Sequence, residues 1–256
     1  MNDQTLLARS KIFLKKVLPF SVLNAAEKTA HRLFPETMKN WQHRVDESIR
    51  QNTLAPRPES HLLMYWDDVQ NPNRKLLMDL IQEELTRIAA EEKRAVKLFE
   101  YGSYCGINFR MLLERTGGLP TELFAVEPNA QAVQFSKSKL PSVTVEQLED
   151  EGFVASSFPG PMDISFVNKV FYLMNSARSF SVLEKLARIS RSIVIGDDMS
   201  NYEGRESYWD RKNNGHIHPY KHWFKTLGFE VVKYLPAPQP YRSISHYLIA
   251  RRTATR

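Results

Sequence analysis

The sequence predicts an α/β fold, in which a mostly parallel sheet carries helices on both faces and follows a helical extension. From Val96 onward, short apolar runs alternate with helical stretches, as is typical of βαβ units. Residues 1–95 show helical periodicity and no convincing strand pattern. The 256 residues, 42% of them hydrophobic, are enough for one sizeable core with an extension. We therefore expect a helical N-terminal extension or cap over residues 1–95 and an α/β domain over residues 96–256.

The extension begins with an amphipathic pattern over residues 5–18, which Pro19 should end. Only Ile12 breaks the pattern. The apolar face of this predicted helix is formed by Leu6, Leu7, Phe13, Leu14, Val17 and Leu18. Its basic face is formed by Arg9, Lys11, Lys15 and Lys16. A basic amphipathic helix can lie on an anionic membrane surface. We favour packing on the main domain or on a second subunit, because amphipathicity is common to all surface helices.

The rest of the extension predicts two further helices. Residues 24–50 look helical, and the Pro-containing stretch Thr53–Ser60 is expected to be a loop. The next helix should begin with Asn71 as its cap and Pro72 at its first position. Its inward-facing residues are Leu77, Leu80, Ile81, Leu85 and Ile88.

The α/β domain contains five strand candidates followed by a pair that differs. The five are Val96–Glu100, Leu123–Glu127, Val143–Val145, Ile164–Asn168 and Ser192–Asp197, and the helices between them include Ile107–Arg115, Asn129–Ser138 and Ser176–Arg188. Near the end, Phe229–Leu235 and Ser243–Arg251 are joined by a Pro-rich connection without a helix. Two consecutive strands of this kind predict an antiparallel pair at one edge of the sheet.

Composition narrows the class of protein. The 35 basic and 29 acidic residues are spread along the chain, so the net charge of +6 is weak evidence for nucleic-acid binding. Cys105 is the only cysteine, which excludes an intramolecular disulfide and a cysteine-based zinc site. No apolar run reaches the ~18 residues of a membrane span, and no signal-peptide pattern is present. A cytoplasmic protein is expected, with peripheral membrane contact through residues 5–18 as the alternative.

The strongest chemical signal is the turn after the strand that begins at Val96. Gly102 and Gly106 lie in it, and glycine permits both the backbone angles of a tight turn and the close approach of a ligand. Glu127 stands about 20 residues after Gly106, at the end of the next predicted strand. A carboxylate there can accept hydrogen bonds from both ribose hydroxyls of a nucleoside cofactor.

These residues resemble the class I S-adenosylmethionine-dependent methyltransferases over Val96–Arg252. The family's first motif is acidic-x-Gly-x-Gly-x-Gly; Glu100, Gly102 and Gly106 match it, and Tyr104 replaces the middle glycine. The resemblance implies a Rossmann-like, seven-stranded, mostly parallel sheet with an antiparallel last strand, and S-adenosyl-L-methionine as cofactor. Residues 96–256 would be the cofactor-binding domain.

The resemblance also assigns the cofactor residues. Glu127 would bind the ribose, Glu146 or Gln147 the adenine amine, and the end of the fourth strand would lie beside the methionine part. The full set is Glu100, Gly102, Ser103, Tyr104, Gly106, Glu127, Pro128, Glu146, Gln147 and Asn168. A nicotinamide-dependent dehydrogenase is disfavoured, because the turn lacks the G-x-G-x-x-G needed for a pyrophosphate.

Methyl transfer to a hydroxyl requires that the acceptor oxygen be aligned with the methyl group and that a nearby group accept the hydroxyl proton. Asp197 at a strand end, and His216 and His218 in the loop after it, are the candidate catalytic residues. Solvated histidines in a helix-entry loop and a turn-capping aspartate are the alternative interpretation. No metal is expected, since the spacing of Asp197, Asp198, His216 and His218 matches no metal signature.

The candidate residues for binding the methyl acceptor follow the ends of predicted strands. The candidates are Tyr172, Asp198, Tyr208 and Trp209, although isolated aromatic residues are more often part of a core. Cys105 should serve packing. We expect O-methylation of a small-molecule or glycan acceptor, with a homodimer as one option for the assembly. The alternatives are an RNA or protein methyltransferase, and a binding protein that keeps the fold without catalysis.

Overall fold

The computed structural model describes residues 35–116, 121–149, 160–210, 213, 215–239 and 245–253. The chain divides into two compact units, Met1–Ile49 and Arg50–Arg256. The described part of the first unit is helical and belongs to α3 (Pro35–Leu54). The amphipathic helix expected at residues 5–18 lies outside the described residues. The second unit holds the sheet and all of the candidate site residues.

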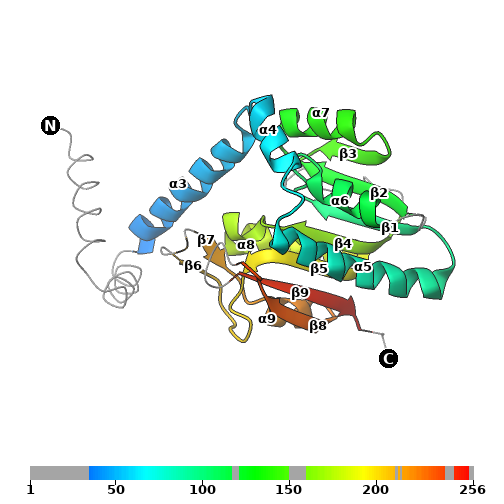
Figure 1. Cartoon of the computed structure of the whole chain (residues 1–256). Helices are drawn as coiled ribbons and strands as arrows, with labels where there is room; N and C mark the ends of the chain where they lie inside the picture. The colour runs from blue at the N-terminus through cyan, green and yellow to red at the C-terminus, as the bar shows by residue number, and fades with distance from the viewer. Residues whose placement is uncertain are drawn as a thin grey trace. The chain divides into compact units, whose positions relative to one another are not determined.

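The second unit is built on a seven-stranded sheet with the order β3-β2-β1-β4-β5-β9-β8 (Figure 1). The strands are β1 (Val96–Tyr101), β2 (Thr121–Glu127), β3 (Val143–Gln147), β4 (Met162–Asn168), β5 (Ser190–Met199), β8 (Phe229–Pro236) and β9 (Ser245–Arg252). Strands β1 to β5 are parallel, and β9 is antiparallel to both of its neighbours. All seven strands expected from the sequence are present, and the mostly parallel sheet with an antiparallel last strand is confirmed.

The chain order reverses between β1 and β4, since β1 pairs with β2 on one side and with β4 on the other. Connections from these two strands leave the sheet in opposite directions. Open α/β sheets bind their ligands at the carboxyl ends of strands beside such a reversal. The fold therefore places the candidate site at the ends of β1 and β4.

Helices cover both faces of the sheet. The helices of the second unit are α4 (Glu59–Trp66), α5 (Pro72–Glu92), α6 (Ile107–Thr116), α7 (Ala130–Lys139), α8 (Ser176–Ile189) and α9 (Tyr220–Thr226), with a 3₁₀ turn η2 (Phe171–Leu173). Residues of α4 to α7 join one buried cluster, which includes Leu98 of β1. Residues of α8 and α9 join the other, which includes the adjacent Phe99. Neighbouring strand residues point to opposite faces, so each face has its own apolar core.

Helix α5 begins as the sequence predicts. The Asn71 side chain accepts a hydrogen bond from the Asn73 amide at 3.0 Å, and Pro72 occupies the first turn. The helix ends at Glu92, and Lys93 directly after it has a left-handed φ of 52°. Because Leu77 and Ile81 are fully buried against the sheet, α5 belongs to the same compact unit as the strands.

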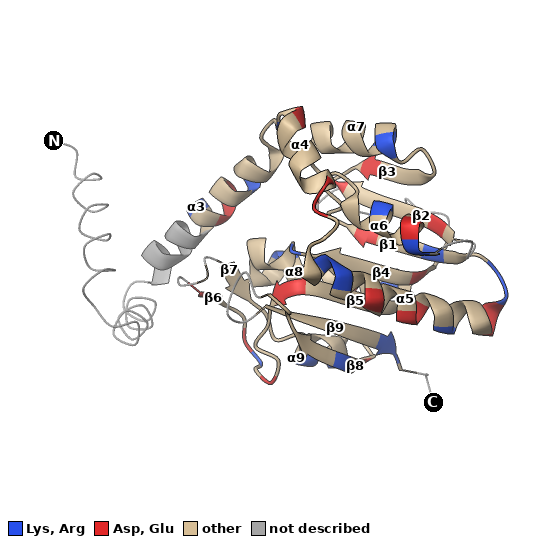
Figure 2. Cartoon of the chain, in the orientation of Figure 1, with Lys and Arg blue, Asp and Glu red and all other residues tan. Residues whose placement is uncertain are grey.

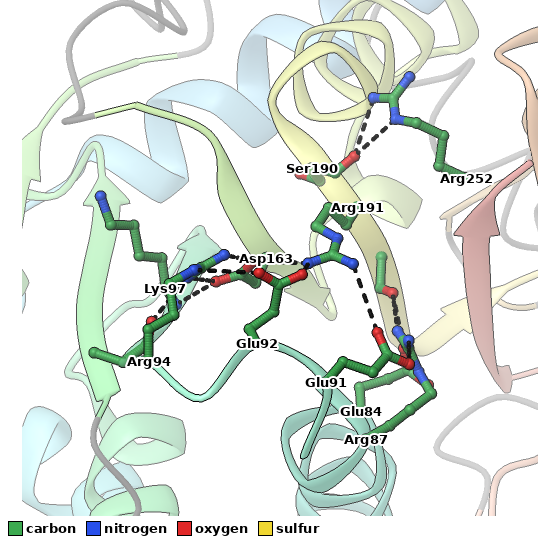
Figure 3. Close-up of polar contacts among 12 residues, drawn as sticks. Glu84, Arg87, Glu91, Glu92, Arg94, Lys97, Asp163, Ser190, Arg191 and Arg252 are labelled. Carbon is green, nitrogen blue, oxygen red and sulfur yellow. Dashed lines mark hydrogen bonds and ion pairs between the residues drawn. The ribbon is translucent and has the colours of Figure 1, made fainter. Parts of the chain in front are cut away.

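A network of charged side chains ties α5 to the amino ends of the strands (Figure 3). Glu84 is fully buried and accepts hydrogen bonds from Arg251 at 2.6 Å, Ser192 at 2.7 Å and Arg87 at 2.9 Å. Burial raises the pKa of Glu84, but these donors outweigh it and leave the pKa below its ordinary value. The network lies at the end of the sheet away from the carboxyl ends of β1 and β4 and therefore stabilises the fold there.

The described surface mixes charges of both signs. Figure 2 shows basic and acidic residues interspersed along α5 and around the ends of the strands. Of the helices that the structure describes, none combines the length and the apolarity required to cross a membrane.

Candidate active site

The turn between β1 and α6 is shaped by its two glycines. Gly102 has φ +77°, and a Cβ there would lie 2.6 Å from Cγ2 of Val170, which comes shortly after β4. Gly106 has φ +80°, and a Cβ there would lie 2.8 Å from Cδ1 of Leu140. Both positions require a left-handed backbone and tight packing, so only glycine fits without strain.

Tyr104 stands between them with φ +48°, a conformation that L side chains rarely adopt. Its side chain reaches helix α4, where its hydroxyl lies 2.7 Å from Nδ1 of His61. Its ring packs edge-on against Tyr65, with 5.3 Å between ring centroids. Its backbone amide donates to Oε2 of Glu127 at 2.8 Å. The side chain of Tyr104 is thus held by α4 while its amide faces the end of β2.

Glu127 ends β2 and is only 4% exposed. Its Oε1 accepts from the Asn129 amide at 3.0 Å and its Oε2 from the Tyr104 amide at 2.8 Å. Burial raises the pKa of Glu127 to about 7, and the two amides act against that rise. Each carboxylate oxygen has two lone pairs, so each can accept one more hydrogen bond.

Four oxygens of the candidate site residues are buried and have no hydrogen-bond partner among the described residues. They are Oε2 of Glu100, Oγ of Ser103, Oδ1 of Asn168 and Oδ1 of Asp197. They lie in or just after the carboxyl-terminal parts of β1, β4 and β5, and every one of them can accept a hydrogen bond. An unsatisfied buried acceptor is costly, so such a set suits ligands that bring hydrogen-bond donors.

Glu100 is fully buried within a polar chain. Its Oε1 accepts from Nδ2 of Asn108 at 2.6 Å, and Oδ1 of Asn108 accepts from Arg74 at 3.0 Å. Burial raises the pKa of Glu100 to about 8, while Asn108 and Arg74 oppose the rise. Arg74, itself buried, also donates to Asp68 at 3.3 Å. The guanidinium thus supports the first acidic residue of the motif through an amide.

The amino end of α5 contributes Asn73 and Arg74, which the sequence did not single out. Asn73 donates to Oδ2 of Asp197 at 3.0 Å, and the same oxygen lies 2.8 Å from Nζ of Lys169. Arg74 supports Glu100 through Asn108. A usable signal was present, because Arg74 stands three residues before the inward-facing Leu77 and so falls on the buried face of the helix.

The two histidines are buried rather than solvated. His216 lies on β7 (Gly215–Ile217), which pairs with β6 (Tyr208–Asp210) as a hairpin where a loop was expected. His218 places Nε2 2.9 Å from the Phe171 carbonyl and Nδ1 3.1 Å from Oγ of Ser207. Because a carbonyl only accepts, Nε2 carries the proton and Nδ1 accepts. Burial lowers the pKa of His218 to about 3.

Asp198 links three elements on this side. Its oxygens accept from the amides of Met199 at 2.8 Å and Tyr172 at 3.3 Å. Burial raises the pKa of Asp198 to about 7, against the effect of those amides and of the neighbouring Tyr220. In the part of the chain that the structure describes, no three side chains among the aspartates, glutamates, histidines and cysteines come together as a possible metal site.

The aromatic candidates lie around the hairpin. Tyr172 belongs to η2, and a Cβ on Gly215 would come within 3.0 Å of its ring, so η2 and β7 are in close contact. The ring of Trp209 packs edge-on against His216, with 4.8 Å between centroids. Tyr208 is 51% exposed. These residues border the carboxyl ends of β4 and β5, and Cys105 is fully buried in the core.

The candidate adenine residues end β3. Glu146 is half-buried and Gln147 is exposed, and successive strand residues point to opposite faces. Gln147 is in register with Glu127, and its amide lies 3.5 Å from the Pro128 carbonyl. Pro128 and Gln147 therefore lie beside the ribose carboxylate candidate.

Comparison with known proteins identifies the fold. No family profile matches the sequence, and no curated protein is significantly similar to it. Magnesium protoporphyrin IX methyltransferase (ChlM) from Synechocystis PCC 6803, solved with bound SAM, superposes with a TM-score of 0.52 at 11% identity over 80% of this chain and 90% of that chain. The chain has the fold of S-adenosylmethionine-dependent methyltransferases.

Two further structures agree. DesVI from Streptomyces venezuelae gives a TM-score of 0.53 at 11% identity, over 78% of this chain and 100% of that chain. The sugar N-methyltransferase KedS8 from Streptoalloteichus sp ATCC 53650 gives 0.50 at 12% identity, over 72% and 88%. At such identities the similarity concerns the fold.

Proposed function

We propose that the chain is an S-adenosylmethionine-dependent methyltransferase with a small-molecule or sugar-like acceptor. The observation that carries this proposal is Glu127: a buried carboxylate at the end of β2, held by two amides and still able to accept two hydrogen bonds. Two ribose hydroxyls supply that number of donors. The adjoining turn at Gly102 and Gly106 lets backbone approach the ligand without side chains between them.

The remaining groups fit the other parts of the cofactor. The unsatisfied oxygens of Glu100, Ser103 and Asn168 suit an ammonium group, which offers three donors and a positive charge. Glu146 or Gln147 would meet the adenine amine beside Pro128. When bound, the cofactor supplies a sulfonium-activated methyl group, and the protein has to align the acceptor and take up its proton.

We assign the proton acceptor to Asp197 for a hydroxyl acceptor. Its Oδ1 has no partner among the described residues, while Oδ2 is held by Asn73 and Lys169. The bound cofactor would give up its methyl group by breaking the sulfur–carbon bond and would leave as a neutral thioether, and Oδ1 of Asp197 would take the proton that the acceptor hydroxyl loses. Both ring nitrogens of His218 are engaged within the fold, so this histidine positions the hairpin. His216, Tyr172, Asp198, Tyr208 and Trp209 would shape the acceptor side.

Calorimetry with S-adenosylhomocysteine tests the cofactor assignment. Wild-type protein should bind it, and Glu127→Ala should weaken binding by about 100-fold, because two hydrogen bonds to a charged group are lost. Absence of binding by the wild type would contradict the enzyme and leave a binding protein that only keeps the fold.

Transfer of labelled methyl groups tests the acceptor. Amino and hydroxyl sugars, porphyrins, bulk RNA and protein are offered in parallel, since KedS8 is described as a sugar N-methyltransferase and ChlM as a porphyrin methyltransferase. Label in a small molecule supports the proposal. Label only in RNA or protein would replace it, and an RNA enzyme would bind bulk RNA with strong salt dependence.

A further inference from the structure

We propose that helix α4 and the segment before it position the ribose carboxylate, acting through the two amides that hold Glu127. This inference rests on the proposed function. It makes His61 a positioning residue outside the sheet and its turns, and it explains how a tyrosine can stand where the motif has glycine.

The first of the two connections from this region to Glu127 passes through Tyr104. The amide that donates to Oε2 of Glu127 belongs to a residue with φ +48°, which an L side chain adopts at a cost. The hydroxyl of Tyr104 bonds to His61, and its ring packs on Tyr65. Burial raises the pKa of Tyr104 to about 12, so the hydroxyl keeps its proton for this bond. These contacts with α4 offset the strain and aim the amide.

The second connection to Glu127 passes through Asn129. Its amide donates to Oε1 of Glu127, while its side-chain amide donates to the carbonyls of Thr53 at 3.0 Å and Ala55 at 2.9 Å. The same side chain caps α7 through the Ala132 amide at 3.1 Å. Both amides that hold Glu127 are therefore tied to one stretch, residues 53–65.

That stretch is itself anchored to the sheet unit. Leu62 of α4 is buried in the core, and the ring of Trp66 packs edge-on against Phe135 of α7 at 5.7 Å. Arg110 of α6 donates to the Trp66 carbonyl at 2.8 Å and lies over its ring. Because α4 is fixed at its far end, His61 can hold Tyr104 in place.

Calorimetry on His61→Phe, Tyr104→Phe and the double variant tests the inference. Each single change removes one hydrogen bond and should weaken S-adenosylhomocysteine binding about fivefold. The double variant should also lose about fivefold, since both changes break the same bond. Adenosine should show the same losses, because the effect passes through the ribose. Met64→Ala, on the 60% exposed face of the same helix, is the matched control and should bind normally.

Two further variants separate positioning from general damage. In a Glu127→Gln background, His61→Phe should cause no additional loss, because the group it positions has already been changed. Tyr104→Gly adopts the left-handed backbone freely and so should stay folded, as thermal melting would show, yet it should still bind about fivefold more weakly.

The outcomes are distinct for the two proposals. If the wild type binds and His61→Phe and Tyr104→Gly bind equally well, the positioning of Glu127 by α4 is contradicted, while the proposed function is not. An equal loss from His61→Phe in the Glu127→Gln background would do the same. A wild type that does not bind would contradict the proposed function, and with it the positioning of Glu127 for ribose binding.

Discussion

At the scale of single residues, the candidate site contains carboxylates that are buried away from water, and their hydrogen bonds offset only part of the cost of burial. Glu127 accepts two amide hydrogen bonds, yet burial still raises its pKa to about 7. No cation contributes to that balance among the described residues. The ionised form is the better acceptor for hydroxyl donors, so ligand binding should be linked to the protonation of this residue.

Adenosine affinity should therefore rise with pH. If the ligand binds the ionised carboxylate, affinity at pH 8 should exceed that at pH 6 by about tenfold for a pKa near 7. Adenosine is preferred as a probe because it lacks the amino-acid part, which titrates. Calorimetry across this range gives the answer, and Glu127→Gln should remove the dependence. A pH-independent affinity in the wild type would mean that Glu127 does not bind the ribose in its ionised form.

Arg74 is the second test at this scale. Arg74→Met removes a buried cation, leaves Oδ1 of Asn108 without this donor, and leaves Oδ2 of Asp68 with the Asn71 side chain as its donor. We expect the free energy of unfolding to fall by about 3 kcal/mol in urea titration. The matched control is Arg115→Met, because Arg115 pairs with Asp79 at the surface and should change stability by less than about 1 kcal/mol. Equal effects from the two would show that Arg74 has no special role.

At the scale of elements, the junction between β1 and α6 couples backbone conformation to packing against Val170, just after β4. Gly102→Ala should lower the free energy of unfolding by about 1 to 3 kcal/mol, since it adds both a strained φ and a clash with Val170. Adding Val170→Ala removes the clash but leaves the strained φ, so the double variant should regain part of the lost free energy of unfolding. A double variant no more stable than the single one would assign the whole cost to the backbone.

Two elements of the site were not anticipated. Helix α4 has eight residues and follows Pro58, so it is too short for a clear 3.6-residue pattern. Strands β6 and β7 have three residues each and are separated by only a short connection. Such short segments form because neighbouring elements hold them: Gly215, for example, packs against Tyr172 and Met199.

At the scale of the whole molecule, buried ionisable groups set how stability changes with pH. Burial raises the pKa of Glu100 to about 8 and the pKa values of Glu127 and Asp198 to about 7, from ordinary values near 4. Between the ordinary and the raised pKa, the folded state binds more protons than the unfolded state. The free energy of unfolding must therefore fall as pH rises through this window, by up to about 1.4 kcal/mol per group per pH unit.

The acid side has the opposite sign. Burial lowers the pKa of His218 to about 3, and the pKa values of Glu84 and Asp163 lie below their ordinary values. The unfolded state then binds more protons, so stability falls as pH drops. Urea titrations from pH 4 to 8 in the absence of ligand should show maximal stability near pH 5. Glu127→Gln should flatten the decline toward pH 8, and a wild type most stable at pH 8 would contradict the burial of these carboxylates.

Local patterns along the chain were sufficient for the fold. Strands β1 to β5, β8 and β9 and helices α5 to α8 were predicted within a few residues, because strand and helix periodicity is a property of neighbouring residues. The position of Glu127 at the end of β2, beside the turn at Gly102, followed from the same reasoning. Sequence by itself thus determined the sheet, its antiparallel last strand and the position of Glu127 at the end of β2.

Only the tertiary structure decided what surrounds that residue. His61 bonds to Tyr104 across 43 positions, and Asn73 to Asp197 across 124. The burial of His216 and His218 likewise depends on elements distant in sequence. Contacts of this kind arise when the apolar faces of helices pack on the sheet, and no local periodicity specifies which polar side chains then meet. The environment of the site is therefore a product of packing, whereas its framework follows from the order of residues.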